Sequence, residues 1–552
     1  MTAPVQMLPR RTEEFSHLGS LILANIRRDR ARLAVWFLSL VGATAAAAQA
    51  MATMYPNPHA EATIARAALM ATPTGQIFGG PGYGLDHYTT GAIVTNELLM
   101  STLLVIAIMS LLLVVRWSRG DEETGRGELV GASCTGRSAP LAAAIVVGFG
   151  LNAVIALGLT AGLMAQGLPL GGSAAYGLGA GLTGCFFVGV GAITAQVFTT
   201  ARAATGAGVA VMGLFFLVRV AGDLGHAQQQ AGEVAGSPLS WFSPFAWPLQ
   251  TRAFVELRLW PLVFPLVLAL ALAALAAFLL HRRDFGAGLV QPKVGRAEAH
   301  PALDSPLALT LRLEWGAFTA WAAGSVILGL SCGFIDVNST IKNLLSGNET
   351  LAKVWGMGES NPANAYFALL LLYGAVFGVA FAMSVVNRLH SSEVRGLAEL
   401  QLSTTVSRQR ILTTALLVAV VGGVAITVLN GLTLAIGGVI VNDASLLALI
   451  KAALALTPAL LVIVGLGIAL FGWVPRAMSL MWLYLVFCIV VRMFGGVFNM
   501  PSWAVKASVF GATPAAPADP ITATPMIVMT LVGLTLMAVG YVGFRRRNIS
   551  VG

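Results

Sequence analysis

The sequence predicts an all-α integral membrane protein with about twelve transmembrane helices in two pseudo-repeated halves of six. The composition is the first reason: 57% of the 552 residues are hydrophobic and 10% are charged, whereas charged residues make up about a quarter of a soluble domain. The second is that about twelve apolar stretches approach the roughly 20 residues that a span needs. The third is a polar pattern in the first half that recurs in the second, which indicates a duplication.

The repeated pattern consists of five residues in each half. Glu122, Gly125, Glu128, Leu129 and Arg137 recur in register as Glu393, Gly396, Glu399, Leu400 and Arg408. Each copy lies between apolar segments long enough to cross a bilayer. We therefore expect the two copies to be equivalent polar loops of two membrane half-proteins.

An amphipathic elbow helix is predicted within a cytoplasmic N-terminal segment, residues 1–32. Apolar residues recur there at helical spacing and arginines follow them, which is typical of a helix on the inner leaflet. The alternative is a secretory signal peptide, since residues 46–50 contain an Ala-x-Ala pattern. However, about thirty mostly polar and charged residues precede the apolar stretch, which is unlike a signal peptide.

Six spans are predicted in the first half, residues 33–281. Their approximate ends are Leu33–Ala52, Leu98–Val115, Leu141–Gly162, Ala175–Phe198, Ala207–Val220 and Trp260–Leu280. A cytoplasmic linker follows at residues 282–317. Its Leu307, Leu311 and Trp315 lie at helical spacing and predict a second elbow helix, unless the next span simply begins early.

Six further spans are predicted in the second half, residues 318–544, before a cytoplasmic tail at 545–552. Their approximate ends are Phe318–Ile335, Tyr366–Val386, Leu412–Leu432, Ala452–Phe471, Met478–Met493 and Met526–Val542. The tail contains Arg546-Arg547-Asn548, which echoes Arg282-Arg283-Asp284 at the start of the linker.

The basic residues predict that both termini are cytoplasmic in a multi-pass plasma-membrane protein. With both ends inside, about 24 of the 33 Lys and Arg residues fall in cytoplasmic segments and about 9 outside. The net charge of +9 then reflects the positive-inside bias, so a nucleic-acid partner is not expected.

The chain lacks the motif that would let it bind ATP in a phosphate loop. None of its five lysines follows a glycine, which excludes G-x-x-x-x-G-K-[ST]. The four cysteines are far apart and suggest neither a disulfide framework nor a metal site. Asp86-His87 is the one acid–histidine neighbour pair, and we interpret it as part of a surface loop because adjacency does not place both side chains on one site.

The segment from Glu393 to Arg408 resembles the Glu-x-x-Gly-x-x-Glu-Leu-x-x-Thr-x-x-Ser-Arg loop of ABC-2-type exporter permeases. The aromatic-proline stretch around Ser243-Pro244 and residues 282–289 are similar to the fused actinobacterial, tetronasin-resistance-type multidrug efflux subunits. The first copy departs from the pattern at residues 133–137, and Val394 stands where the first copy has Glu123.

The resemblance implies that this loop holds a coupling helix that contacts an ATPase subunit. The candidate coupling residues are Glu122, Gly125, Arg126, Glu128, Arg137, Glu393, Arg395, Gly396, Glu399 and Arg408. A plainer interpretation is that the charges only solvate the loop and support a short helix, since Glu122 and Arg126, like Arg395 and Glu399, are four positions apart.

The predicted function is therefore the permease subunit of an ATP-driven exporter, without catalytic residues, metal or cofactor of its own. Two copies of an ATPase subunit would bind ATP and Mg. The expected cargo is a hydrophobic or amphipathic small molecule such as a drug or ionophore antibiotic, extruded in contact with membrane lipids; the substrate-binding residues are unknown.

Two other functions are weighed against this prediction. A proton-coupled secondary multidrug exporter would also have six plus six spans, but it needs a carboxylate in mid-membrane and none is evident. Arg219 and Arg492 lie near outer ends of spans and are interpreted as interfacial anchors whose charged heads reach water, rather than as parts of an outer gate. An intramembrane transferase would use Asp86 or Glu97.

Overall fold

A computed structural model gives the fold for residues 14–71, 73–224, 238–291, 295, 297–335, 337, 362–494 and 500–547. The ends of the predicted cytoplasmic segments, 1–13 and 548–552, lie outside these described residues, as do parts of the predicted outer segments at 225–237, 338–361 and 495–499. Within the described residues, twelve helices are long and apolar enough to cross a membrane, which confirms the predicted all-α membrane fold.

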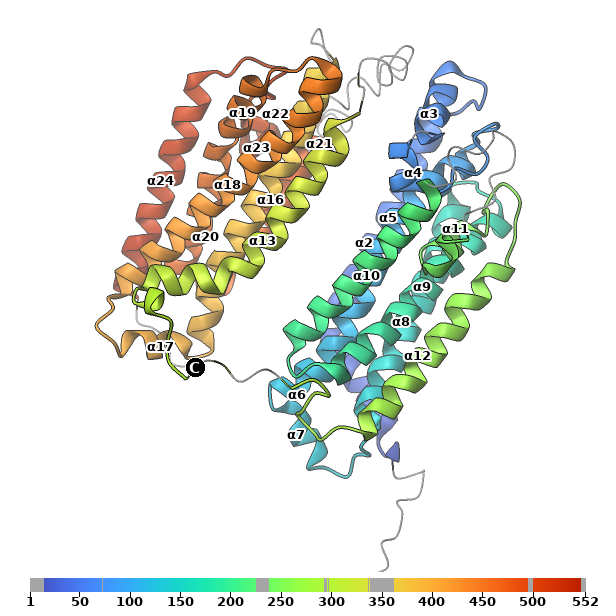
Figure 1. Cartoon of the computed structure of the whole chain (residues 1–552), viewed down its shortest axis with the longest axis horizontal. Coiled ribbons are helices and arrows are strands. Elements are labelled where there is room, and N and C mark those ends of the chain that lie inside the picture. The colour runs from blue at the N-terminus through green and yellow to red at the C-terminus, as the bar shows by residue number, and fades with distance from the viewer. Residues whose placement is uncertain are drawn as a thin grey trace, which may run out of the picture. The chain divides into compact units, whose positions relative to one another are not determined.

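The chain divides into two compact units, Met1–Gly295 and Arg296–Gly552 (Figure 1). Each is described by itself below. That the two units are pseudo-repeats of six spans stays a prediction.

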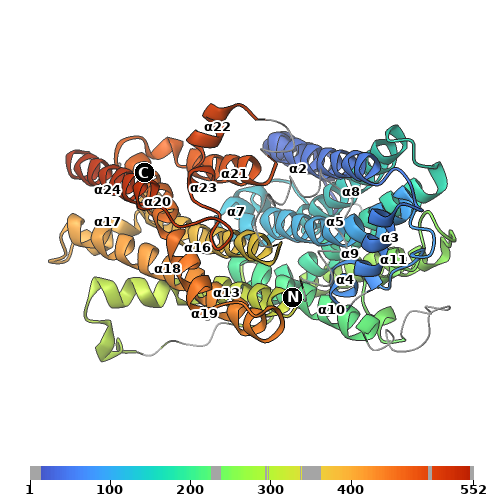
Figure 2. The ribbon, with the colours of Figure 1, turned by 90° about the horizontal axis from the view of Figure 1, so that it is seen from above.

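Helix α9 is the centre of the first unit, where it packs against α5, α8, α10 and α12. The first long helix, α2, packs against α8 and α5, and α2 and α8 lie side by side in Figure 2. The long helices are α2 (Leu18–Met54), α5 (Thr90–Val115), α8 (Ala139–Ala165), α9 (Leu170–Val197), α10 (Ala201–Leu224) and α12 (Val263–His281). The short ones are α3 (Glu61–Ala71), α4 (Pro73–Gly79), α6 (Asp121–Glu123), α7 (Arg126–Gly131) and α11 (Ala246–Leu249).

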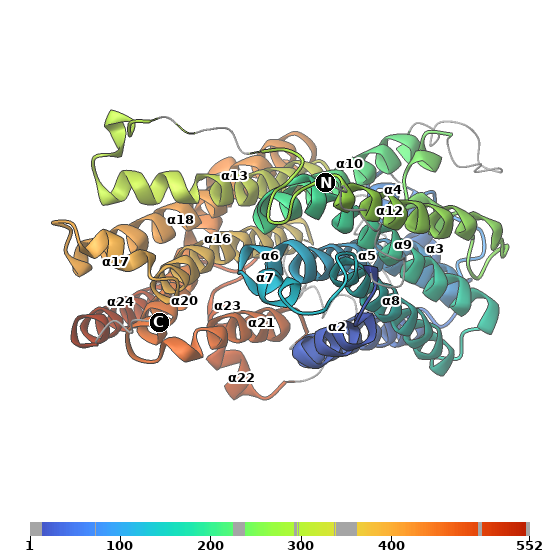
Figure 3. The same ribbon diagram turned by 90° about the horizontal axis from the view of Figure 1, so that it is seen from below.

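Helices α16, α18 and α20 form the middle of the second unit, with α13 against α18 and α24 along α20; α20 and α24 are neighbours in Figure 3. The long helices are α13 (Pro306–Gly333), α16 (Pro362–Val394), α18 (Arg408–Asn442), α20 (Thr457–Trp473), α21 (Ser479–Phe494) and α24 (Ala523–Arg546). Helix α19 (Leu446–Ala455) directly precedes α20, and the two together form one of the twelve candidate spans. The short ones are α17 (Leu397–Leu402), α22 (Ser502–Ala507) and α23 (Val509–Ala512).

Most helices extend beyond the predicted spans because polar residues continue them. Helix α5 begins eight positions before the predicted Leu98, and the Thr89 side chain accepts a hydrogen bond from the Ala92 N–H at its start. This cap satisfies one of the amide groups that a helix leaves without an internal partner. Hydropathy alone therefore marks the apolar middle of a helix and not its ends.

The two predicted elbows differ. In α2 the helix is broken at Asp29, whose φ of −107° and ψ of 16° are not helical, so the expected amphipathic segment is set off from the span. In the second unit α13 runs from Pro306 as one helix. Residues 307–315 thus belong to the same helix as the span, and a second elbow lying on the membrane surface stays a prediction.

Four glycines let α20 and α24 approach at backbone distance. A Cβ on Gly472 would lie 2.3 Å from the Gly540 carbonyl oxygen, and one on Gly465 would lie 2.6 Å from that of Gly533. Small residues at such interfaces allow close helix packing where the hydrophobic effect contributes little. The packing of α24 against α20 thus depends on a pair of glycines, seven positions apart, in each of the two helices.

We expect Gly540→Ala to destabilise the second unit by about 1–3 kcal/mol, because the new methyl group overlaps backbone atoms of α20 that have no room to move. A Cβ at Gly540 would meet the Ile468 carbonyl carbon at 2.4 Å. The measurement is the thermal unfolding midpoint in detergent. Gly316→Ala is the matched control, since a Cβ there meets nothing within 4 Å; equal midpoints for both variants would contradict the packing argument.

Candidate functional site

The two repeated loops have the same backbone course. Residues 122–137, the first loop, connect α5 to α8, and residues 393–408, the second loop, connect α16 to α18. In each, a glycine in the left-handed region precedes a six-residue helix: Gly125 with φ 74° before α7, and Gly396 with φ 71° before α17. Glycine adopts this conformation without the steric cost that a Cβ brings.

Equivalent backbone hydrogen bonds close both turns. The Gly125 N–H donates to the Glu122 carbonyl at 3.1 Å, and the Gly396 N–H donates to the Glu393 carbonyl at 3.0 Å. The repeat of sequence is thus also a repeat of local structure, with a glutamate fixed just before the turn.

An ion pair attaches the first loop to the end of the last long helix of its unit. Arg283, which follows α12, donates to Glu122 through both carboxylate oxygens, Nη2 to Oε1 at 2.5 Å and Nη1 to Oε2 at 3.0 Å. The Arg283 side chain is 2% exposed and that of Glu122 is 13% exposed. Such bidentate pairs are directional as well as strong. We call this ion pair the first brace.

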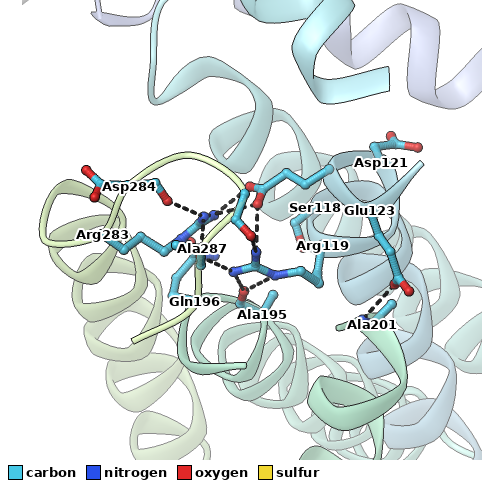
Figure 4. A network of polar contacts seen from close by, with 12 residues as sticks. Ser118, Arg119, Asp121, Glu123, Ala195, Gln196, Ala201, Arg283, Asp284 and Ala287 are labelled. Atoms are coloured by element: carbon cyan, nitrogen blue, oxygen red, sulfur yellow. Dashed lines mark hydrogen bonds and ion pairs between the residues drawn. The ribbon is translucent and has the colours of Figure 1, made fainter. Parts of the chain in front are cut away.

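Arg119 adds a second cation to the same carboxylate, with Nη1 2.9 Å from Glu122 Oε2. Its remaining N–H groups donate to the backbone carbonyls of Ala195, at the end of α9, and of Ala287, after α12. Figure 4 shows Arg119 and Arg283 converging between these segments, while Glu123 accepts from the Ala201 N–H at the start of α10. The first loop is therefore attached to three long helices at once.

The second loop has a brace in the same position. Arg547, just after α24, pairs through Nη2 with Glu393 Oε2 at 2.6 Å. Its guanidinium also lies over the rings of Phe471 and Phe544, at 5.2 and 5.9 Å from their centroids. We call the Glu393–Arg547 ion pair the second brace. It contains a single arginine, whereas the first brace is supported by Arg119.

The arginine at the end of each loop also contacts the segment after the last long helix of its unit. Arg137 donates to the Arg283 carbonyl at 2.6 Å, and Arg408 donates to the Arg547 carbonyl at 3.4 Å. Both ends of the first loop therefore contact Arg283, after α12, and both ends of the second loop contact Arg547, after α24.

An acid on the first long helix of each unit forms a further contact. Asp29 of α2 accepts from Trp117 Nε1 at 2.7 Å, and Glu314 of α13 pairs with Arg388 at 2.5 Å. Trp117 lies five residues before Glu122, and Arg388 lies five before Glu393. Both acids are buried. The start of each loop is thus joined to the first as well as the last helix of its unit.

The structure divides the ten candidate coupling residues into two groups. Glu122, Gly125, Arg137, Glu393, Gly396 and Arg408 shape the loops or contact the braces. Arg126, Glu128, Arg395 and Glu399 are exposed. Next to the two glutamates, Leu129 is 77% and Leu400 is 70% exposed. We call Glu128-Leu129 and Glu399-Leu400 the loop tips; they combine an apolar and an anionic side chain on a fixed backbone.

The internal ion pairs expected within each loop are wrong. Glu122 pairs with Arg119 and Arg283, and Arg126 lies 3.8 Å from Asp121. Among the described residues no ion pair joins Arg395 and Glu399. The physical reason is the glycine between the partners, which ends one helix and starts another and so removes the four-residue helical spacing.

At the other end of the first unit, Arg219 is not the anchor reaching water that the sequence suggested. Its side chain is 0% exposed and lies 3.2 Å from Asp223, which accepts from Ser240 at 2.6 Å. Arg219 also donates to the carbonyls of Gln76 and Ile77 in α4. Burial with an acid and two carbonyls makes it a packing residue. Arg492 is exposed.

Glu97 is likewise bound within the fold, because Arg66 of α3 pairs with it at 2.6 Å. Burial alone would lower the pKa of Arg66, but the charge of Glu97 and its hydrogen bonds outweigh this and raise that pKa. Burial raises the pKa of Tyr88, which donates to Glu97. Asp86 and His87 are exposed.

Sequence reasoning missed the partners of the repeated glutamates. The duplicated Arg282-Arg283 and Arg546-Arg547 pairs were recognised as an echo, but they lie 161 and 154 positions from Glu122 and Glu393. The sequence did contain a signal for these ion pairs. The glutamate and the arginine are both duplicated, and both lie at cytoplasmic ends of predicted spans, so each glutamate and arginine could have been predicted to pair.

Comparisons with known proteins agree with a transport protein. A family model described as the C-terminal domain of the multidrug efflux system permease Rv1217c matches residues 303–545. The chain is also 30% identical, over 548 residues, to the multidrug efflux system permease protein Rv1217c of Mycobacterium tuberculosis (strain ATCC 25618 / H37Rv). That similarity covers 98% of this chain and 97% of the relative, so it extends over both units.

We expect Glu122→Gln to destabilise the first unit by about 3–5 kcal/mol, because it leaves two buried arginines without their counter-charge. Glu393→Gln should destabilise the second unit by less, because it removes the counter-charge of only one arginine, and that arginine also stacks on two aromatic rings. Thermal unfolding in detergent measures both. Glu128→Gln is the control, at an exposed position of the same loop. A control as destabilised as Glu122→Gln would show that the brace has no special role.

Proposed function

Because the chain belongs to the family of multidrug efflux permeases that includes Rv1217c, we propose that it is the permease subunit of an ATP-driven, ABC-2-type exporter of the fused, tetronasin-resistance type. Two copies of a separate ATPase subunit bind ATP and Mg and dock on the loop tips. The chain itself provides the path across the plasma membrane, with both termini in the cytoplasm.

The observation that carries the proposal is the pair of loop tips. A leucine exposed by 70% or more in a fixed, charged loop, repeated in both units, has the chemistry of an interface residue without its partner. Loops that only solvated charge would not need an exposed leucine or a buried brace. Two equivalent tips suit two copies of one partner.

The braces support the proposed mechanism. Closure of the ATPase dimer would move the tips, and a loop joined to both the first and last helix of its unit transmits that movement as a rigid body. Without such attachment, a six-residue helix would tilt or unfold under load, since helices this short are unstable alone.

The cargo is proposed to be hydrophobic or amphipathic, taken from the inner leaflet. In support, the second unit has a groove of about 340 Å³ lined almost wholly by apolar side chains of α13, α16 and α18, among them Leu311, Trp315 and Val421. Ligand sites for apolar compounds have this character. The printed name of the relative, a multidrug efflux permease, agrees with cargo of this class.

The test is co-purification of the tagged chain with candidate ATPases from its own genome, followed by ATP hydrolysis in lipid. Glu399→Ala should weaken the complex or its hydrolysis. Failure of every candidate ATPase to bind, together with drug movement down an imposed proton gradient, would contradict the proposal in favour of a secondary exporter.

We further expect the double variant Leu129→Ser/Leu400→Ser to recover about tenfold less ATPase, because burying one leucine contributes about 1.5 kcal/mol or more. Its thermal midpoint should not change, since both side chains are exposed. Leu257→Ser is the control: this exposed leucine lies in a predicted outer segment. Equal recovery of ATPase by both variants would rule out the tips as the docking site.

A further inference from the structure

A cleft of about 600 Å³ in the first unit is lined by residues of α2, α5 and α10. Helix α5 packs against both of the other two. The cleft lies at the end of the unit where the first loop begins, because Arg116, one of its lining residues, directly follows α5. We call it the arginine cleft, since three of its lining residues are arginines and none is an acid.

The arginine cleft has a cationic rim and an apolar interior. On each of the three helical segments an arginine lies four positions from a second lining residue, so that both share one helix face. These pairs are Arg32 with Trp36, Arg116 with Leu112, and Arg202 with Gly206. In every pair the arginine is nearer the first loop, because α2 and α10 begin beside that loop and α5 ends there. This polarity is that of an amphiphile with an anionic head group.

The acids near the cleft do not neutralise its arginines. Arg32 and Arg116 share the single carboxylate of Asp29, at 2.7 and 3.4 Å. Glu123 accepts from the first N–H of α10. Arg202 is exposed and forms no ion pair among the described residues. The side chains of Arg32 and Arg116 are 42% and 45% exposed, and a guanidinium group has five N–H donors. Donors and positive charge therefore remain for a ligand.

We propose that the arginine cleft binds an anionic phospholipid, with the phosphate among the three arginines and an acyl chain against Trp36 and Leu112. Arginine forms bidentate hydrogen bonds with phosphate oxygens, and basic pockets between transmembrane helices suit anionic head groups. The apolar wall favours a lipid over a soluble anion, and tryptophan is typical of the depth at which lipid head groups lie.

A head group with net negative charge fits this cleft better than a zwitterionic one. The ammonium group of a zwitterionic lipid would place a further cation beside the arginines, and like charges repel. The position of the cleft in the inner leaflet rests on the topology given under the proposed function. The affinity of the cleft for the lipid does not rest on it.

The second unit does not repeat this set of charges. In the register of the repeated loops, Arg116 corresponds to Asn387. In the register of the buried acids on the first long helices, Arg32 corresponds to Ala317. The third arginine has a counterpart in Arg476, which is also exposed and also the second residue of a candidate span. Arg476 is therefore a matched control, an arginine in the same setting without the other two.

Native mass spectrometry of the full chain in detergent tests the proposal without any ATPase. The chain is titrated with phosphatidylglycerol or with phosphatidylcholine of the same acyl chains, and the apparent Kd for phosphatidylglycerol should be about fivefold lower or less. Arg202→Gln should raise that Kd about fivefold, since this is the contribution of one arginine near an anionic lipid surface. Arg476→Gln should bind as wild type.

A second variant fills the cleft without changing its charge. A Cβ on Gly206 meets nothing within 4 Å, so Gly206→Leu should fold, and its side chain should occupy apolar space that the acyl chain needs. The Kd for phosphatidylglycerol should then rise about fivefold or more. Gly150→Leu on α8, where a Cβ also meets nothing within 4 Å, is the control and should bind as wild type.

Three results would overturn the proposal: equal affinity for the two lipids, an equal loss of affinity in Arg202→Gln and Arg476→Gln, or unchanged binding in Gly206→Leu. Displacement of the lipid by millimolar glycerol 3-phosphate would also overturn it, because the cleft would then be a site for a soluble anion. Loss of ATPase binding with the expected lipid results intact would instead count against the proposed function alone.

Discussion

The loops depend on one interaction, the ion pair between the glutamate before the turn and the arginine after the last long helix. Helices α7 and α17 have six residues each, and isolated helices of that length are not stable in water. The glycine before each of them permits the turn but does not fix its direction. What fixes it is Glu122 on Arg283 and Glu393 on Arg547.

The braces and the loop tips divide the polar residues of the repeat by role. The glutamate that begins the pattern faces inward and connects helices, while the glutamate six residues later faces outward beside an exposed leucine. The acids Asp29 and Glu314 join the same region to the first helix of each unit. A force applied at a loop tip would therefore act on both the first and the last long helix of its unit, as the proposed coupling to a separate ATPase requires.

Composition and the apolar runs predicted the membrane fold and the approximate position of each span, because burial in lipid restricts composition over some 20 consecutive residues. They did not predict the helix ends, where caps such as Thr89 act, or the burial of Arg219, whose acceptors come from α4 more than 140 positions away. The repeat marked the right loops but not their internal contacts, because Gly125 and Gly396 interrupt the helical spacing on which the expected ion pairs relied.

The most direct test is a double-mutant cycle on each brace, read as the free energy of loop opening from hydrogen exchange. Glu122→Gln, Arg283→Gln and their combination form one cycle, and Glu393→Gln, Arg547→Gln and their combination form the other. The account predicts a coupling energy of about 1 kcal/mol or more in both units, since the partners are in direct contact. Effects that add to within about 0.5 kcal/mol would show that the partners act independently and would contradict it.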